Sequence, residues 1–439
     1  MIAPALPAPS QLICLGRDGL RRGSDLLDDA RRVRVGLAGY HAVCNLAERR
    51  YDFAATLIAA MAEGVVTVLP SSRAEHAVAA ALGSHANPLV VDSLERFAGR
   101  PAGGPLDRVP GDVHVFTSGS TGVPARHLKN WTSLAGGARL AACLFARAGL
   151  APGRSLIVGT TPHQHMYGLE ATIFAALAHG HCISDDVPFY PADLDAVVER
   201  AALSGFDRIA LVTSPPHLRY LEARVRALPQ IRCVISATAP LHRDMARGLE
   251  RAGCQVFEIY GCTEAGSLAW RRTAMDELWT PLEGFRLISG EDGWDATAPH
   301  LTGGVQLPDE LEAEPDGRFR LLGRRGDMVR IAGKRQSLGA LNAALSTLSS
   351  VRDAVIVRET ASGEDRLRIY VVPAPGGETD ADALARLVRE HMRRHVDPVF
   401  VPRRVTLVSE LPRRATGKMA AGDLATLAAA GATPRMDLA

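Results

Sequence analysis

Short apolar segments alternate with longer amphipathic stretches through the first two thirds of the chain. The segments Ser155 to Val158, Arg208 to Thr213 and Arg232 to Ser236 are rich in Ile and Val, and each follows a helix-like stretch of Ala, Leu and Arg. Strands that alternate with helices form parallel sheets, because a crossover helix returns the chain to the same edge. The pattern predicts an α/β fold with mostly parallel, doubly wound sheets in a large N-terminal domain.

The pattern changes between about residues 301 and 330, where Gly, Pro and acidic residues replace the regular alternation. The segments Thr302-Gly303-Gly304 and Pro315-Asp316-Gly317 have the composition of turns. We therefore expect a domain boundary in this region.

A second pattern of apolar residues follows the boundary. Strand-like runs occur at Ala354 to Val357, Leu367 to Val372 and Val405 to Val408. A helix between the last two runs presents one face made of Leu384, Leu387, Val388, His391 and Met392. These elements predict a small α+β domain at the C-terminal end.

The composition is that of a globular protein. Of 439 residues, 47% are apolar and 22% are charged, which suits two domains with sizeable cores. Fifty Lys and Arg nearly balance 48 Asp and Glu, so the net charge of +2 argues against a dedicated nucleic-acid binder. No signal peptide or membrane span is recognisable in the sequence, and we expect a cytoplasmic protein.

Cysteine and histidine give no strong metal signal. The seven cysteines include no C-x-x-C pair, which argues against a disulfide framework and a structural zinc site, and we expect them to be buried. His163-Gln164-His165 could suggest a metal site, but no third or fourth ligand stands nearby. A pocket or packing role is the favoured interpretation.

The most informative segment is the run from Phe116 to Pro124, FTSGSTGVP, in which a strand-like start enters a loop of hydroxyls and glycines. Glycines let consecutive backbone N–H groups converge on an anion, and Ser and Thr add donors without bulk, so the loop is suited to phosphate. No Lys follows in the frame of a Walker loop. The alternative is a flexible surface loop.

Three further motifs follow in order. They are EIYGCTE at Glu258 to Glu264, GRRGDMVRIAGKR at Gly323 to Arg335, and ELPRRATGK at Glu410 to Lys418. Together with the first, they resemble the motifs of the adenylate-forming superfamily of acyl- and aryl-CoA synthetases, nonribosomal adenylation domains and luciferases. The resemblance runs from about Tyr51 to Met419. It implies an N-terminal ATP- and acid-binding domain over residues 1–325 and a mobile C-terminal domain over residues 326–439.

The resemblance also implies roles for individual residues. Thr263 would bind the α-phosphate, Glu264 would hold Mg²⁺, and Lys418 would bridge carboxylate and phosphate as charge builds up. The other ATP-binding residues would be Thr117, Ser118, Gly119, Ser120, Thr121, Gly122, Tyr260, Gly261, Asp309, Arg324 and Arg335. The acid pocket would contain His165, Tyr167, Gly168, Ala237, Thr238 and Cys262. Gly326 would be the hinge, because glycine tolerates the backbone change of a rotating domain.

The chain departs from the family pattern at three places. Ala125 stands where the family usually has Lys, and Arg126 or Lys129 could replace that cation. Leu307-Pro308 precedes Asp309 in place of Thr-Gly, so an exposed turn acid is the alternative for Asp309. Leu341-Asn342-Ala343 stands where the family has a Glu pair.

The resemblance implies an ATP- and Mg²⁺-dependent ligase that converts a small carboxylic acid into acyl-AMP and passes the acyl group to a thiol. The chain is similar to the short synthetases found beside bacterial aryl-polyene and xanthomonadin-type pigment genes, which load hydroxybenzoate-like acids onto acyl carrier protein. His163, His165 and Tyr167 would contact an aryl ring or its hydroxyl. The alternatives are coenzyme A as the acceptor, a non-catalytic AMP-binding regulatory protein, and an oxygenase of the luciferase kind.

Overall fold

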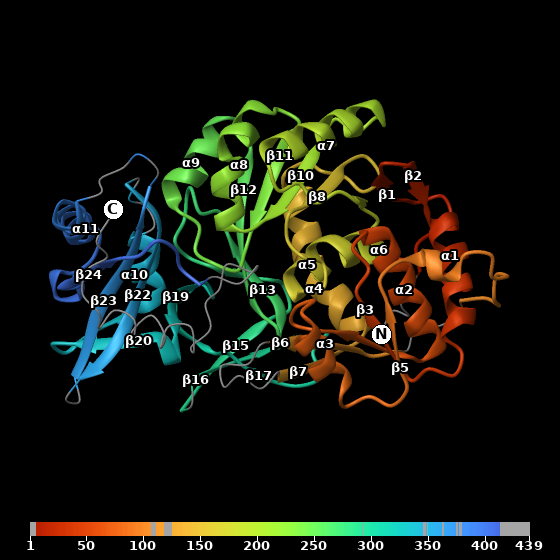
Figure 1. The fold of residues 1–439 in the computed structure, drawn as a ribbon, viewed down its shortest axis with the longest axis horizontal. Coiled ribbons are helices and arrows are strands. Elements are labelled where there is room, and N and C mark those ends of the chain that lie inside the picture. Colours follow the sequence, from red (N-terminus) through yellow and green to blue (C-terminus); the bar gives the residue numbers. More distant parts are fainter. Residues whose placement is uncertain are drawn as a thin grey trace. The chain divides into compact units, whose positions relative to one another are not determined.

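A computed structural model of the chain describes residues 6–106, 111–117, 125–291, 293–345, 348, 350–361, 364–374, 376 and 380–412. The chain forms two compact units, which Figure 1 shows coloured along the sequence. Unit 1 comprises Met1–Ile288 and Asp295–Val305, and unit 2 comprises Ser289–Trp294 and Gln306–Ala439. Within the described residues, no helix has the length and apolar character needed to cross a membrane.

The centre of unit 1 is a nine-stranded sheet with the order β14-β13-β12-β11-β10-β8-β9-β1-β2. Its strands are β1 (Leu12–Gly16), β2 (Gly19–Arg22), β8 (Leu156–Gly159), β9 (Cys182–Ser184), β10 (Ile209–Thr213), β11 (Ile231–Ser236), β12 (Gln255–Cys262), β13 (Gly266–Arg271) and β14 (Thr280–Pro281). The pairs from β12 through β11, β10, β8 and β9 to β1 are all parallel. The predicted parallel sheet is confirmed, and three predicted strands correspond to β8, β10 and β11.

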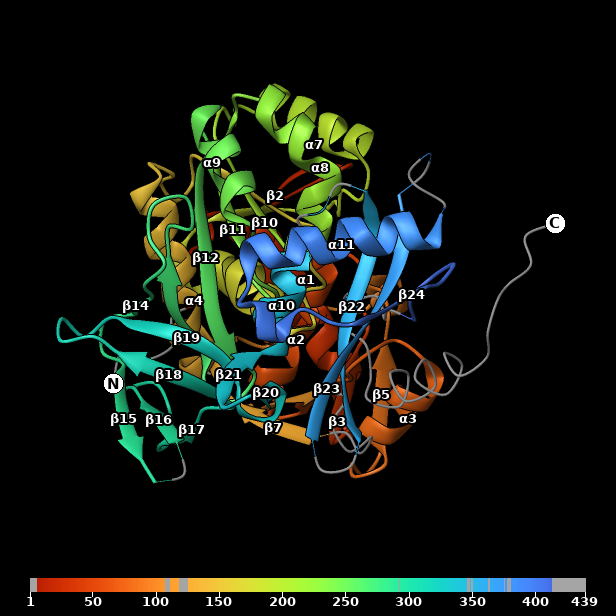
Figure 2. The same ribbon diagram turned by 90° about the vertical axis from the view of Figure 1, so that its left-hand side faces the viewer.

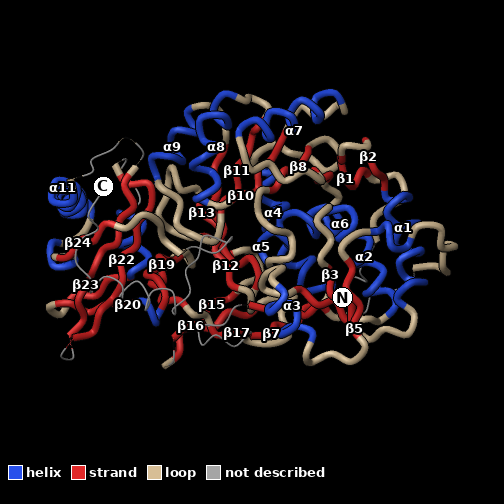
Figure 3. The backbone as a smooth tube through the Cα atoms, viewed as in Figure 1, coloured by secondary structure: helices blue, strands red, loops and turns tan. Residues whose placement is uncertain are grey.

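Helices cover both faces of this sheet (Figures 1 and 3). One face carries α7 (Pro191–Leu203), α8 (Pro215–Ala227) and α9 (Arg243–Arg251), whose apolar residues join those of the strands in one core. The other face carries α4 (Trp131–Arg147), α5 (Met166–Gly168), η2 (Leu169–Phe174) and α6 (Ala175–His179). Burial on both sides explains why these strands read as continuous apolar runs.

A second sheet of unit 1 has the order β5-β3-β4-β6-β7. Its strands are β3 (Ala42–Asn45), β4 (Val66–Leu69), β5 (Pro88–Val91), β6 (Val113–Thr117) and β7 (Ala125–Lys129), with α1 (Gly23–Leu37), α2 (Arg50–Glu63), α3 (Glu75–Leu82) and η1 (Leu94–Phe97) in the same region. All pairs are parallel except β6 with β7. Helix α2 is buried from Arg50 to Met61, so it has no solvent-facing stripe.

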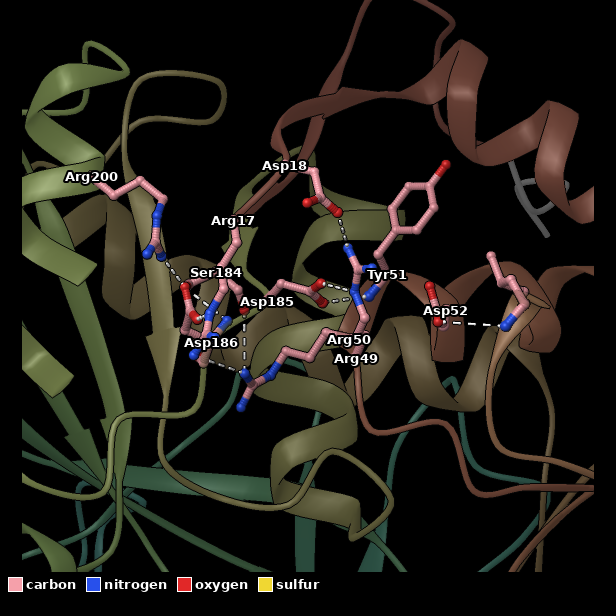
Figure 4. A network of polar contacts seen from close by, with 11 residues as sticks. Arg17, Asp18, Arg49, Arg50, Tyr51, Asp52, Ser184, Asp185, Asp186 and Arg200 are labelled. Carbon is pink, nitrogen blue, oxygen red and sulfur yellow. Dashed lines mark hydrogen bonds and ion pairs between the residues drawn. The ribbon is translucent and has the colours of Figure 1, made fainter. Parts of the chain in front are cut away.

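A polar network ties the start of α2 to the large sheet (Figure 4). The Arg50 guanidinium is fully buried and donates to four main-chain oxygens, those of Gly159 (2.8 Å), Thr161 (3.3 Å), Ser184 (3.2 Å) and Asp186 (3.1 Å). These oxygens lie at or just beyond the carboxyl ends of β8 and β9. Burial lowers the pKa of Arg50 to about 10. Arg50 therefore holds two loops of the large sheet against α2.

Acidic side chains extend the same network towards the surface (Figure 4). Asp185 accepts hydrogen bonds from Arg49 Nε (2.7 Å) and from the Tyr51 main-chain N–H (3.0 Å). Asp186 pairs with Arg17 and Arg200. The connection after β9 is thus fixed by charges on both sides.

In the residues that the structure describes, unit 2 is built from small sheets and two α-helices. Its elements are β18 (Asp309–Ala313), β19 (Phe319–Arg324), η3 (Arg325–Asp327), β20 (Met328–Ile331), β21 (Lys334–Ser337), α10 (Leu338–Leu345), β22 (Val351–Ala361), β23 (Glu364–Pro373), α11 (Ala381–His395), η4 (Pro398–Phe400) and β24 (Arg404–Leu407). A further three-stranded sheet, β15 (Arg286–Gly290), β16 (Gly293–Thr297) and β17 (Val305–Gln306), occupies the stretch where the chain passes between the units.

The sheet β22-β23-β24 and helices α10 and α11 form the predicted α+β unit (Figure 2). Asp380 caps α11 by accepting from the N–H groups of Asp382 and Ala383. Leu384, Val388 and Met392 are buried, as predicted. The prediction for Leu387 was wrong, because this side chain is 40% exposed and lies beside the apolar stripe.

The seven cysteines follow the expected burial only in part. Cys14, Cys44, Cys182, Cys233 and Cys254 are buried and free, which confirms the prediction for these five. Cys143 is exposed, which corrects the prediction there, and Cys262 is half-buried.

Candidate functional site

Strand β6 delivers the chain to the predicted phosphate loop. It ends at Thr117, and β7 returns beside it with Ala125 opposite Thr117. The loop residues Ser118, Gly119, Ser120, Thr121 and Gly122 lie outside the described residues. The described hairpin therefore fixes both ends of the loop.

The second motif forms a tight turn between antiparallel strands β12 and β13. A Cβ on Gly261 would collide with the carbonyl oxygen of Gly266, so this position needs glycine. Thr263 is half-buried, and the Glu264 side chain is 44% exposed. The turn thus leaves the Glu264 carboxylate accessible to solvent and Thr263 partly accessible.

His127 on β7 joins the two motifs. Its Nε2 shares a hydrogen bond with Thr117 Oγ1 at 3.2 Å, and its Nδ1 lies 3.8 Å from Glu264 Oε1. Burial lowers the pKa of His127, and the Glu264 carboxylate opposes that shift. The structure therefore brings Thr117 and Glu264, two residues predicted for MgATP, to opposite sides of one imidazole ring.

Tyr260, one of the predicted ATP-binding residues, is mostly enclosed by protein. Tyr260 is 7% exposed and its ring lies 5.8 Å from that of Trp279. Next to it, burial raises the pKa of the Cys262 thiol to about 12, so this cysteine stays protonated. The structure therefore places the Tyr260 ring in a largely buried position beside Trp279.

The His163 to Gly168 segment follows β8, and its polar groups are largely used by the fold. His163 is buried, its Nε2 shares a hydrogen bond with the Ala47 oxygen at 2.9 Å, and burial lowers its pKa to about 3. The Tyr167 hydroxyl donates to the Ile235 oxygen at 2.7 Å. A Cβ on Gly168 would collide with the Pro162 oxygen. His163 and Tyr167 thus anchor the segment, and His165 is half-buried.

The second pocket segment carries backbone strain. Ala237 is buried and Thr238, which follows β11, has a φ of 78°. A β-branched residue in the left-handed region is an outlier, because Cβ crowds the backbone. Such strain costs about 1–3 kcal/mol and is concentrated at functional sites.

Replacing Thr238 by Gly is expected to raise the free energy of unfolding by about 1 kcal/mol, because glycine adopts this backbone without crowding. Thermal unfolding would measure the gain. Thr238→Ala is the matched control, since alanine keeps a Cβ in the same strained position and should gain much less. A stability gain for alanine equal to that for glycine would contradict the assignment of strain.

Sequence reasoning missed a hydrogen-bonded group at the carboxyl ends of β8 and β10. Thr160 Oγ1 lies 2.8 Å from Thr213 Oγ1 and 3.2 Å from His217 Nδ1. The exposed Phe189 ring lies 5.3 Å from that of His217. The order of the sheet reverses at β8, and ligands of open α/β sheets bind outside such strand ends. The sequence signal that could have revealed this group is the presence of polar residues directly after an apolar strand.

Glu170 in η2 is a second residue that the sequence did not reveal. Its side chain is buried, and its Oε2 accepts from the Ser267 N–H (2.8 Å) and hydroxyl (2.6 Å). Burial raises the pKa of Glu170 to about 7, against the opposing effects of Ser267 and Lys129. The acid is therefore partly protonated near neutral pH.

This pKa predicts a pH dependence of stability. A folded-state pKa raised from 4.5 to about 7 favours folding below pH 4.5, and this contribution is lost as the pH rises to 7. Glu170→Gln keeps an acceptor for Ser267 but cannot ionise. Its unfolding free energy relative to the native chain is expected to rise by about 3 kcal/mol between pH 4.5 and 7. Denaturant unfolding at several pH values would measure this difference, and a constant difference would refute it.

Unit 2 holds two of the predicted ATP-binding residues, Asp309 and Arg324. Asp309 begins β18 and lies opposite Arg324 at the end of β19. Asp309 is 8% exposed, so it is not the exposed turn acid of the alternative interpretation. Arg335 lies on β21 opposite Arg330, with its side chain outside the described residues, as is the whole of Lys418.

The predicted hinge residue is exposed within η3. A Cβ on Gly326 would meet no atom within 4 Å, so this conformation does not itself require glycine there. In contrast, Gly323 has a φ of 116° and a Cβ there would collide with Ser337. The described backbone thus requires glycine at position 323, just before the predicted hinge. At position 326 it would also accept a residue with a side chain.

Glu264 suits the magnesium ion that the sequence resemblance implies. Its carboxylate is part-exposed, and carboxylate oxygens are the hard ligands Mg²⁺ prefers. The described residues contain no group of three or more His, Cys, Asp or Glu placed to hold a metal. Mg²⁺ needs no such group when substrate phosphates and water supply its other ligands.

Comparisons with known proteins agree with these observations. The protein-family model described as AMP-binding enzyme matches residues 112–284. The family model described as AMP-binding enzyme C-terminal domain matches residues 340–418. A 4-coumarate–CoA ligase of Halorhodospira halophila is 29% identical over 311 residues, which cover 69% of this chain and 73% of that protein.

Solved structures extend the likeness to nearly the whole chain. The o-succinylbenzoate CoA synthetase of Bacillus subtilis in complex with its acyl-adenylate has a TM-score of 0.80 at 16% identity, over 95% of this chain and 96% of that one. The same protein with ATP and magnesium gives 0.75 at 15% identity, over 94% and 96%. At these identities the likeness establishes the fold. The two family matches cover the N-terminal and C-terminal parts in the expected order, and the chain belongs to the AMP-binding enzymes, the adenylate-forming acid ligases.

Proposed function

We propose that this ligase adenylates a small carboxylic acid, preferably a hydroxybenzoate-like aryl acid, and transfers the acyl group to the phosphopantetheine thiol of an acyl carrier protein. One observation carries the adenylation step. Thr117, at the entry of the hydroxyl-rich loop, and Glu264 lie on either side of His127. A phosphate-binding loop beside a carboxylate suited to Mg²⁺ is the arrangement that MgATP needs.

The reaction has two balanced steps. A carboxylate oxygen of the acid attacks the α-phosphorus of ATP, and the bond to pyrophosphate breaks. The thiol sulfur then attacks the acyl carbon, the bond to AMP breaks, and the thiol proton is released. Bound Mg²⁺ would neutralise phosphate charge during the first step.

The residues have distinct roles in this proposal. Thr263 contacts the α-phosphate and Glu264 holds the metal ion. Asp309 accepts hydrogen bonds from the ribose hydroxyls, with Arg324 as its cross-strand neighbour. Lys418 stabilises the charge that develops during adenylation.

The C-terminal domain, residues 326–439, rotates about Gly326 between the two steps. A cavity of about 510 Å³ has walls from both sides of this residue, including Glu310 and Leu321 before it and Gln336 and Ala340 after it. Incomplete packing at this place is compatible with movement. Rotation removes Lys418 from the adenylate and opens a path for the thiol.

The proposed preference for aryl acids is based on the name of one relative, 4-coumarate–CoA ligase. Because His163 Nε2 and the Tyr167 hydroxyl bind main-chain oxygens, we expect these two atoms to position the pocket segment and not to bind a ring hydroxyl. Other polar atoms come from Thr238, which follows β11, and from the Thr160–Thr213–His217 group at the carboxyl ends of β8 and β10. Coenzyme A is the alternative acceptor, since the relative's name includes it.

ATP–pyrophosphate exchange with 3-hydroxybenzoate, 4-hydroxybenzoate, 4-coumarate, octanoate and acetate tests the proposal. We expect exchange with the hydroxybenzoates above that with octanoate and acetate. Preference for octanoate would refute the aryl assignment, and no exchange with any acid would favour a non-catalytic AMP-binding protein. With the best acid, transfer to a phosphopantetheinylated carrier protein is expected to exceed transfer to coenzyme A, and the reverse order would refute the acceptor assignment.

A further inference from the structure

The turn that carries Thr263 and Glu264 departs from regular strand pairing. Tyr260 pairs with Ala269 and Gly261 with Ser267, so Leu268 has no opposite residue. Such a bulge releases backbone groups from the ladder, and bulges beside active sites redirect side chains. Other contacts must therefore fix the turn.

Two buried ionisable side chains, one basic and one acidic, make these contacts. Lys129 Nζ donates to the Glu264 main-chain oxygen at 2.5 Å, and Glu170 Oε2 accepts from the Ser267 N–H and hydroxyl. Lys129 is 6% exposed and Glu170 is 1% exposed. The carbonyl on one side of the turn and the amide on the other thus each bind an ionisable side chain.

The surrounding backbone leaves a space shaped for the Glu170 carboxyl group. A Cβ on Gly137 of α4 or on Gly266 of β13 would collide with this group. Two glycines from separate elements therefore accommodate one acidic side chain. Burying an ionisable group costs free energy, so filling space does not by itself explain an acidic residue at this position.

The choice of lysine at position 129 is unusual for this chain. Only three of its 50 basic residues are lysines, namely Lys129, Lys334 and Lys418. Arginine presents a planar fork, whereas lysine places a compact charge on a flexible stem. A single carbonyl in a buried site suits the ammonium group.

We propose that Lys129 and Glu170 are positioning residues for adenylation. They form a buried clamp that holds the Thr263–Ala265 turn so that Thr263 and Glu264 meet the phosphates and Mg²⁺; this inference rests on the proposed function. Lys129 acts through the Glu264 carbonyl and does not replace the phosphate-loop lysine that is missing at Ala125. Arg126 lies on the opposite face of β7, because side chains alternate along a strand.

The clamp is tested with Lys129→Met, Lys129→Arg and Glu170→Leu in the full chain. Loss of a residue that orients a metal ligand typically costs 10–100-fold, so each variant is expected to raise the KM for MgATP about tenfold or more. The free Mg²⁺ concentration for half-maximal activity should rise as well. The KM for the acid should change less than about threefold, because the clamp contacts the turn of the metal ligand. Arg219→Met, an exposed change on α8, is the control and should alter neither constant.

The results separate the clamp from its alternatives. Equal rises in the KM values for MgATP and acid would overturn the proposal, because general distortion would then explain the loss. Full activity in Lys129→Arg would overturn the requirement for a compact charge. If Arg126→Met lost MgATP affinity while Lys129→Met did not, Arg126 would be the relevant cation and the clamp would be wrong.

Direct nucleotide binding keeps this test independent of the reaction. Thermal unfolding of the native chain and of Lys129→Met is measured with increasing MgATP and with ATP plus chelator. The clamp predicts that Lys129→Met weakens protection by MgATP and leaves metal-free ATP less affected. If no acid supports pyrophosphate exchange but this difference appears, the proposed function fails and the clamp stands. Identical protection of both proteins would refute the clamp, whatever the activity.

Discussion

Lys418→Ala is expected to lower acid-dependent pyrophosphate release by about 10²–10³-fold, while transfer from supplied acyl-AMP to the thiol survives. The physical reason is that the substrate carboxylate and the α-phosphate are both anionic. A positioned cation lowers their repulsion only while they approach each other. The second step has no such approach, since the adenylate is already formed.

The measurement compares two assays on one protein preparation. Pyrophosphate release reports adenylation, and thioester formation from added acyl-AMP reports transfer. Arg394→Ala is the control, because Arg394 forms an exposed ion pair with Glu390 on α11 and such pairs contribute little. Equal loss of both steps in Lys418→Ala would contradict the role given to Lys418.

Arg50→Met is expected to destabilise unit 1 by about 3–5 kcal/mol, because four buried carbonyl groups lose their charged donor. Methionine fills much of the space but donates no hydrogen bond. Figure 4 shows the guanidinium at the connection after β9. Its hydrogen bonds to the Gly159 and Thr161 oxygens reach the connection after β8 as well. Loosening them should also disturb the His163 to Gly168 segment, which follows Thr161.

The midpoint of thermal unfolding measures this effect and should fall by about 5–10 °C. Arg17→Met is the matched control from the same network. Its side chain is 84% exposed and pairs with Asp186, so a change of less than about 1 kcal/mol is expected. Arg50→Lys should fall between the two, because an ammonium group can serve only some of the four oxygens. Equal stability of Arg50→Met and Arg17→Met would refute the structural role of Arg50.

The missing Lys at Ala125 shows how a local departure from a motif can be misleading when considered alone. The sequence offers Arg126 and Lys129 as equivalent replacements, since both lie within four residues. In the fold they lie on opposite faces of β7, and the Lys129 ammonium contacts the Glu264 carbonyl. Distance along the chain therefore does not decide which cation serves the phosphate site.

The sequence by itself determined the class of fold, the small α+β unit and the order of the four motifs. These features are local, because a strand or helix is encoded by periodic apolar residues and a loop by its glycines and hydroxyls. The assignment of Thr117 and Glu264 to one site also followed from motif resemblance. Their separation along the chain gave no independent physical reason for it.

Only the tertiary structure showed that His127 joins Thr117 and Glu264, that Glu170 and Lys129 hold the turn, and that Arg50 binds four distant carbonyls. Each of these polar residues has a partner far away in the sequence, so neither periodicity nor spacing predicts its contacts. The left-handed backbone of Thr238 was equally hidden, because threonine normally signals extended structure. Burial and non-local hydrogen bonding give these residues their roles, and both arise only when the sheets and helices have assembled.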